Sequence, residues 1–141
     1  MATVLAFDYG ERRIGVAVGD QEVGIAHPLL TIDSEKNAER FGAIAGLIAE
    51  WHPERLVVGL PVHMDGTPHA MTEQCQRFAR RLSGRFGLPV QLVDERLSSA
   101  VAASALREAG VRGRQQKPML DQVAAQQILQ TYLENPNHDL T

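Results

Sequence analysis

Three acidic positions, far apart in the chain, have residue types and surroundings suited to holding a metal ion. The first is Asp8, which ends the apolar stretch 3–7 and is followed two residues later by Gly10. Such a stretch is typical of a strand with both faces covered, and glycine allows a sharp turn after it. A carboxylate there is costly to desolvate unless an arginine, backbone N–H groups or a metal ion meets it. We therefore expect Asp8 to have a partner in the fold.

The second position is the pair Asp94 and Glu95, which ends another apolar stretch, 89–93, and the third is Asp121. In a helix predicted over 119–133, Asp121 shares one face with three residues that must pack inward, Ala124, Ala125 and Ile128. The helix dipole alone favours an acid near a helix N-terminus by about 0.3–1 kcal/mol, which is a competing explanation. That explanation does not account for an acid on the inward face, so we predict a functional role.

These acids would meet if the strands before Asp8 and Asp94 run parallel, because the carboxyl ends of parallel strands lie along one sheet edge. Carboxylates that lie a few ångströms apart repel each other unless a cation neutralises them. Ligand sets made only of oxygen favour Mg²⁺ or Mn²⁺. Paired ions of this kind activate a water molecule and stabilise the leaving oxygen in phosphodiester cleavage. The pattern therefore predicts a metal-dependent nuclease site.

Basic residues flank the first two acidic positions and could bind a phosphate. Arg12 and Arg13 follow Asp8, although arginines at a solvated hairpin tip are an equally good interpretation. Arg96 follows Glu95, where a structural ion pair is the alternative. We retain all three arginines as candidate substrate contacts.

A second group of candidate substrate contacts precedes the third acid. A basic loop predicted over 111–118 contains Arg112, Arg114 and Lys117, and Lys117 precedes Asp121 by four residues. From 77 to 117 the chain has nine basic residues against three acidic ones, whereas the whole chain carries a net charge of -3. Four of these basic residues, Arg77, Arg80, Arg81 and Arg85, lie in one predicted helix, where they could follow a nucleic-acid backbone or form an ordinary solvated face.

The order of predicted elements indicates an α/β fold with a mixed five-stranded sheet and helices on its faces. Strands are expected over 3–7, 14–20, 24–32, 55–60 and 89–94, and the third is expected at a sheet edge because Pro28 removes a ladder donor. A helix over 37–51 should bury a stripe that ends at Trp51. The next helix should begin at Thr67 and Pro68 and end at Gly87, and a third should run from 98 or 99 to 110.

Length and composition indicate one domain over 1–141, with a flexible tail over 134–141. Cys75, the single cysteine, lies on a predicted apolar stripe, so we expect an ordinary core residue. We expect a cytoplasmic protein, because the chain shows neither a secretory signal nor an apolar run of about 20 residues that could cross a membrane.

Several short motifs together resemble the YqgF (RuvX) nuclease family, over a span from Ala6 to about Leu129. The matching segments are 8–10, 13–17, 58–61, 64–66 and 94–99, followed by Lys117, Asp121, Ala124-Ala125 and Ile128-Leu129. Any one of these motifs alone would be weak evidence. The chain departs mildly from the family pattern at Ser98-Ser99, where two threonines are common, and at Leu120, where valine or isoleucine is usual.

The resemblance implies a ribonuclease H-like fold of the Holliday-junction-resolvase type. It also implies trimming of the 5′ end of precursor small-subunit (pre-16S) ribosomal RNA during ribosome biogenesis, and it implies that Asp8, Glu95 and Asp121 are the catalytic metal ligands. The choice of Glu95 over Asp94 rests on the family pattern alone.

Other functions fit parts of the same pattern. Cleavage of four-way DNA junctions is the nearest alternative and would need a homodimer to place two symmetric cuts, whereas an RNA nuclease could be a monomer or a homodimer. The Asp-x-Gly hairpin also resembles the phosphate loop of actin-like ATPases and sugar kinases, which generally need two such domains. A non-catalytic RNA-binding assembly factor would fit the basic stretch but would not need the carboxylate of Asp8.

Overall fold

The fold contains five strands and three helices in the described part of the chain. A computed structural model describes residues 2–60, 71–94 and 116–134, of which 94 and 116–121 are described by their backbone alone. The elements are β1 (Thr3–Tyr9), β2 (Arg13–Asp20), β3 (Ile25–Asp33), α1 (Asn37–Trp51), β4 (Arg55–Leu60), α2 (Thr72–Phe86), β5 (Val90–Asp94) and α4 (Gln116–Glu134). No described helix is long and apolar enough to cross a membrane.

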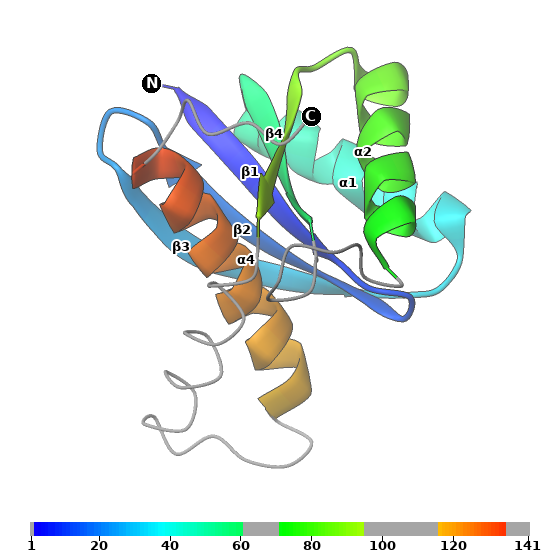
Figure 1. Ribbon diagram of the computed structural model, residues 1–141. Coiled ribbons are helices and arrows are strands. Elements are labelled where there is room, and N and C mark those ends of the chain that lie inside the picture. The colour runs from blue at the N-terminus through cyan, green and yellow to red at the C-terminus, as the bar shows by residue number, and fades with distance from the viewer. Residues whose placement is uncertain (1, 61–70, 95–115, 135–141) are drawn as a thin grey trace.

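The strands form one mixed sheet in the order β3-β2-β1-β4-β5 (Figure 1). Strand β2 is antiparallel to both β1 and β3, whereas β1, β4 and β5 run parallel to one another. The predicted mixed five-stranded sheet is confirmed. The third strand lies at an edge, as Pro28 indicated, and its pairing with β2 shifts register between Val16 and Ala17, opposite the proline.

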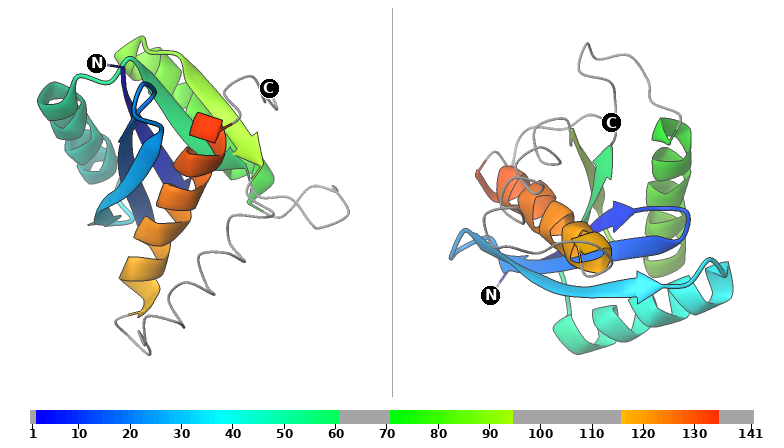
Figure 2. Two further views of the ribbon diagram at one scale, coloured as in Figure 1. Left: turned by 90° about the vertical axis from the view of Figure 1, so that its left-hand side faces the viewer. Right: turned by 90° about the horizontal axis from the view of Figure 1, so that it is seen from below.

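Two hydrophobic cores cover the two faces of the sheet, as expected for a layered α/β fold. On one face α1 and α2 pack against β1, with Phe41, Phe78 and Leu82 contacting the cluster around Leu5 and Phe7. On the other face α4 packs through its buried residues Ala125, Ile128 and Leu129. Figure 2 shows α1 and α4 on opposite sides of the sheet. The predicted placement of helices on both faces is therefore confirmed.

Helix α4 lies close to the sheet because the residues between them are small. Ala6 and Ala17 of the sheet and Ala125 of the helix are all fully buried in the α4-facing core. A Cβ atom added to Gly19 of β2 would lie 3.1 Å from a Leu129 methyl group and 3.2 Å from one of Leu133. The small residues therefore let α4 lie close to β1 and β2.

Most predicted elements match the structure, but Trp51 and Lys117 are placed differently from the prediction. Trp51 is 36% exposed rather than buried, because α1 ends there, His52 turns the chain with a φ of 49°, and the indole lines an open hollow with Ile25 and Leu29. Lys117 lies in the first turn of α4 rather than in a loop. Pro118 is tolerated beside it because the first N–H groups of a helix have no intrahelical partner.

Several predicted features lie outside the described residues. Helix α2 begins at Thr72, later than expected, and the predicted start at Thr67 and Pro68 lies outside the described residues. The helix expected over 98–110, the loop to 115 and the tail from 135 are outside as well. The predicted C-terminus of α2 is confirmed, since Gly87 caps it with a φ of 66°, and Cys75 is buried in the core as expected.

Candidate active site at the carboxyl edge of the sheet

Asp8 lies near the end of β1, on the face of the sheet that α4 covers. Side chains alternate along a strand, and Val4 and Ala6 belong to the α4-facing core, so Asp8 shares that face. Its partner in β2 is Gly15. On the β4 side the last paired residues are Phe7 and Val58, and Gly59 follows Val58. Both neighbouring strands therefore place a residue without a side chain beside Asp8, which leaves room around its half-buried carboxylate.

The three parallel strands end at one edge of the sheet, as the convergence of the acids requires. Strand β4 ends at Leu60 and β5 ends at Asp94, and these two residues are paired. The parallel pairing of β1 with β4 and of β4 with β5 puts the end of β1, with Asp8, at that same edge. The sequence prediction required the strands that end at Asp8 and Asp94 to run parallel, and they do.

Helix α4 carries Asp121 and packs across the face on which Asp8 lies. The residues that share its predicted inward face, Ala124, Ala125 and Ile128, are all buried. The side chain of Asp121 and all of Glu95 lie outside what is described. Within the described ranges, no three acidic, histidine or cysteine side chains gather closely enough to hold a metal ion. The three-carboxylate site therefore stays a prediction. The structure places Asp8 and the backbone of α4 on the same face of the sheet.

The arginines of the first hairpin lie beside the candidate site. Arg12 is exposed in the turn between β1 and β2, and Arg13 is the first residue of β2. Strand alternation puts Arg13 on the same face as Gly15 and Asp8. Both arginines line a hollow of about 380 Å³ with Asp33 and Glu35, so acidic residues share their surroundings.

The remaining candidate substrate contacts are not placed by the structure. Arg96, Arg112 and Arg114 lie outside the described segments. Lys117 is located by its backbone in the first turn of α4, one helical turn before Asp121. These four residues stay predictions.

A buried arginine that sequence reasoning missed holds the turn after Asp8. Arg40 of α1 is 2% exposed, and its Nη2 atom donates hydrogen bonds to the carbonyl oxygens of Gly10 at 2.7 Å and Glu11 at 2.6 Å. Its Nε atom donates to the carbonyl oxygen of Ser34. A signal was present in the sequence: Arg40 precedes the buried Ile44 and Leu47 by four and seven residues, the same spacing that singled out Asp121.

A row of glutamines, also missed, attaches α4 to the edge strand β3. The Gln130 side chain accepts a hydrogen bond from Ala26 N at 3.0 Å and donates one to the Gly24 carbonyl oxygen at 2.9 Å. Gln126 donates to the Ala26 carbonyl oxygen at 3.1 Å, and Gln122 donates to Thr31 Oγ1 at 3.1 Å. These bonds occupy part of an otherwise open sheet edge and fix the position of α4 along it.

Comparison with known proteins agrees with this architecture. Among solved structures, T. thermophilus RuvC in complex with a Holliday junction substrate aligns with a TM-score of 0.59 over 99% of both chains, at 16% identity. That likeness concerns the fold and confirms the predicted ribonuclease H-like class. A family model described as RuvX: Holliday junction resolvase matches residues 2–135. The chain belongs to the RuvX family.

Relatives of this RuvX-family chain are close in sequence along nearly their whole length. A protein of Methylobacillus flagellatus is 65% identical over 93% of this chain and 90% of its own, and one of Chromobacterium violaceum is 62% identical over 94% and 97%. Both carry the name "Putative pre-16S rRNA nuclease". The family resemblance identified from the motifs is confirmed.

Proposed function

We propose that this RuvX-family chain is a divalent-metal-dependent endonuclease that hydrolyses phosphodiester bonds at the 5′ end of pre-16S ribosomal RNA, in the cytoplasm. The observation that carries the proposal is the position of Asp8. Its half-buried carboxylate lies at the carboxyl edge of three parallel strands, flanked by Gly15, on the face that α4 covers, and Asp121 belongs to α4. The names of the close relatives support the choice of an RNA substrate.

We propose Asp8, Glu95 and Asp121 as the residues that hold the metal. The donor set contains only carboxylate oxygens, which suits Mg²⁺ or Mn²⁺. The choice of Glu95 over Asp94 rests on the family pattern. When bound, such ions activate water and stabilise the leaving oxygen.

The basic residues are assigned to the substrate strand. Arg13, on the face of Asp8, would donate hydrogen bonds to a phosphate oxygen, and Lys117 would offset charge on the phosphate near Asp121. The exposed Arg12 would contact the backbone beyond the hairpin tip. Three further contacts are proposed on the family pattern and the local charge, Arg96, Arg112 and Arg114.

A matched pair of variants tests the metal assignment. Asp8→Asn removes a charged ligand with little change in shape, whereas Glu11→Gln makes the same change at the exposed hairpin tip. At Mn²⁺ about 100-fold above its dissociation constant, one bound ion stabilises the wild type by about 2.7 kcal/mol. We expect a matching rise in melting temperature for the wild type and Glu11→Gln, and none for Asp8→Asn. An equal rise in all three would remove Asp8 from the metal site.

Cleavage assays then test the reaction itself. We expect Asp8→Asn to lose cleavage of a pre-16S RNA fragment by more than about 100-fold, beyond the loss typical of groups that only support a ligand. Glu11→Gln should cut at the wild-type rate. If Asp8→Asn still cuts, Asp8 is not part of the catalytic site. If Asp8→Asn does not cut but still supports ribosome assembly in cells, the chain acts in assembly as a non-catalytic RNA-binding factor.

A second candidate function is resolution of four-way DNA junctions. The RuvC-like fold over 99% of both chains favours it, together with the description of the family model. Two symmetric cuts need a homodimer, whereas RNA cleavage does not. Parallel incubation with junction DNA and pre-16S RNA, with the oligomeric state measured by light scattering, separates the two. Preferential cutting of RNA supports the first proposal, and junction cutting by a dimer supports the second.

A further inference from the structure

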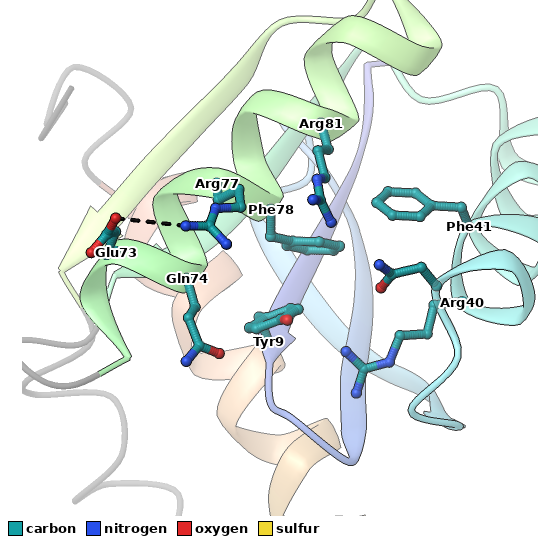
Figure 3. A pocket seen from close by; sticks show the side chains of 9 residues that line it. Tyr9, Arg40, Phe41, Glu73, Gln74, Arg77, Phe78 and Arg81 are labelled. Atoms are coloured by element: carbon teal, nitrogen blue, oxygen red, sulfur yellow. Dashed lines mark ion pairs between the residues drawn. The ribbon is translucent and has the colours of Figure 1, made fainter.

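A hollow of about 450 Å³ lies between α1 and α2, on the face of the sheet opposite to Asp8 (Figure 3). Tyr9 of β1, Arg40 of α1 and three residues of α2, Gln74, Arg77 and Arg81, contribute to its lining. Its size is in the range of small-ligand sites, which are about 300–1,000 Å³. The nuclease proposal above makes no use of this hollow.

The charge of the lining favours an anion. Three arginines contribute to it, against the single carboxylate of Glu73. Arg40 is engaged by backbone carbonyl oxygens, and Arg77 lies 3.6 Å from Glu73 in an exposed pair, a kind that contributes little and exchanges readily. Arg81 is exposed and pairs with no acid in the described segments. A single carboxylate cannot make a metal site, so the ligand that fits best is a phosphate.

The other walls suit the sugar and base attached to such a phosphate. The rings of Tyr9 and Phe78 pack with their centroids 4.7 Å apart and form an aromatic wall, which Figure 3 shows beneath Arg81. The guanidinium of Arg40 lies 5.3 Å from the centre of the Tyr9 ring and holds it in place. The side-chain amide of Gln74 adds a donor and an acceptor. A volume of about 450 Å³ admits a nucleotide of one strand rather than a duplex.

The position of the hollow relates it to the candidate active site. Asp8 and Tyr9 are consecutive in β1, so their side chains lie on opposite faces at the same edge of the sheet. A nucleic-acid strand that rounds this edge passes from one to the other. We propose that the hollow binds a backbone phosphate of single-stranded RNA, mainly through Arg81 and Arg77, and so anchors the strand whose neighbouring segment reaches Asp8. This inference rests on the proposed nuclease function.

Helix α2 provides a matched control for the test. Arg80 precedes Arg81 and is also exposed, but it lines a separate hollow with Val90 and Leu92 of β5. Arg80→Ala and Arg81→Ala therefore remove the same charge one residue apart. A general electrostatic effect would weaken RNA binding equally in both variants, whereas a phosphate site would be affected by Arg81→Ala alone.

The experiment measures binding without cleavage. A single-stranded RNA of about 12 nucleotides, within the range of one single-strand site, is titrated in EDTA at several salt concentrations and followed by fluorescence anisotropy. We expect Arg81→Ala to weaken binding several-fold and to reduce the salt slope by about 0.7, and Arg77→Ala with Arg81→Ala to reduce it by about 1.4. Arg80→Ala should keep the wild-type slope. Equal effects of Arg80→Ala and Arg81→Ala, or no effect of either, would overturn the proposal.

Two further measurements separate this proposal from other outcomes. One outcome is that a nucleoside monophosphate binds in the hollow, whereas Arg81→Ala binds RNA with the wild-type affinity. The hollow would then be a site for free nucleotides, and the assignment to RNA would be overturned. Asp8→Asn should bind the RNA as the wild type does in EDTA. If Asp8→Asn stops cleavage while Arg81→Ala binds normally, the anchoring site fails and the nuclease stands. If Asp8→Asn cuts at the wild-type rate while Arg81→Ala loses binding, the anchoring site stands and the catalytic assignment of Asp8 fails.

Discussion

The Nη2 atom of Arg40 lies 2.7 Å from the carbonyl oxygen of Gly10, two residues after Asp8. The same atom reaches the carbonyl oxygen of Glu11, and the guanidinium carbon lies over the ring of Tyr9. One buried side chain of α1 therefore holds the end of β1 and the turn that follows it. The conformation of the chain around Asp8 depends on this contact across 30 residues of sequence.

Replacing Arg40 by methionine should destabilise the fold. The change keeps a long side chain but removes the buried guanidinium that donates hydrogen bonds to the carbonyl oxygens of Gly10, Glu11 and Ser34. A hydrogen bond from a charged group contributes about 1.5–3 kcal/mol, so we expect a loss of about that size in the free energy of unfolding. Urea denaturation measures it. Arg80→Met is the control, since Arg80 is exposed, and an equally small effect of both variants would contradict the structural role of Arg40.

Gly10 should tolerate no side chain, in contrast to glycines of α1. A Cβ atom at Gly10 would lie 2.7 Å from the carbonyl oxygen of Arg13, so the hairpin backbone must shift. We expect Gly10→Ala to lower the free energy of unfolding by about 1–3 kcal/mol, as overpacking does. Gly42→Ala should instead raise it by about 0.5–1 kcal/mol, because nothing lies within 4 Å of the added methyl and alanine favours a helix. Thermal melts distinguish the two.

The hydrogen bonds from Gln130 should contribute more to the stability of the fold than the packing of its side chain does. Gln130→Leu keeps the size of the residue but leaves Ala26 N and the Gly24 carbonyl oxygen unpaired, so we expect a loss of about 1–3 kcal/mol. Gln127→Leu is the control, because this half-buried side chain makes no hydrogen bond to any described residue. Faster amide exchange at Ala26 in Gln130→Leu alone would confirm the contact. Equal exchange in both variants would contradict it.

The close packing of α4 on the sheet predicts a linked effect on metal binding. Ala125 is fully buried against the sheet in the core that contains Ala6, so Ala125→Leu must push the helix outward. We expect a loss of about 1–3 kcal/mol in stability, together with weaker Mn²⁺ binding, because α4 carries Asp121. Calorimetric titration of the folded variant measures the affinity. Ala43→Leu, an exposed change on α1, should alter neither. Unchanged Mn²⁺ affinity in Ala125→Leu would show that the position of α4 does not control the site.

Much of the architecture around Asp8 follows from the sequence because it depends on local patterns. The apolar run of β4, with a helix on either side, requires parallel strands connected by crossovers, and parallel strands end at one edge. That reasoning predicts Asp8 at the shared edge, and Pro28 alone predicts that β3 lies at an edge of the sheet. The same local reasoning predicts wrongly that Trp51 is buried, because helical periodicity does not report how far the sheet extends beneath the last turn of α1.

The contacts between segments far apart in the chain were decided only by the tertiary structure. The row of glutamines on α4 has the composition of a solvated face, and only the fold reveals that Gln126 and Gln130 bind strand β3, some 100 residues earlier. Likewise the arginines of α2 form one basic cluster in the sequence, yet packing directs Arg81 into the hollow beside Tyr9 and Arg80 into another. A pattern of residue types reports which face of an element is apolar. The partner of each polar side chain depends on distances that exist only after the elements have packed.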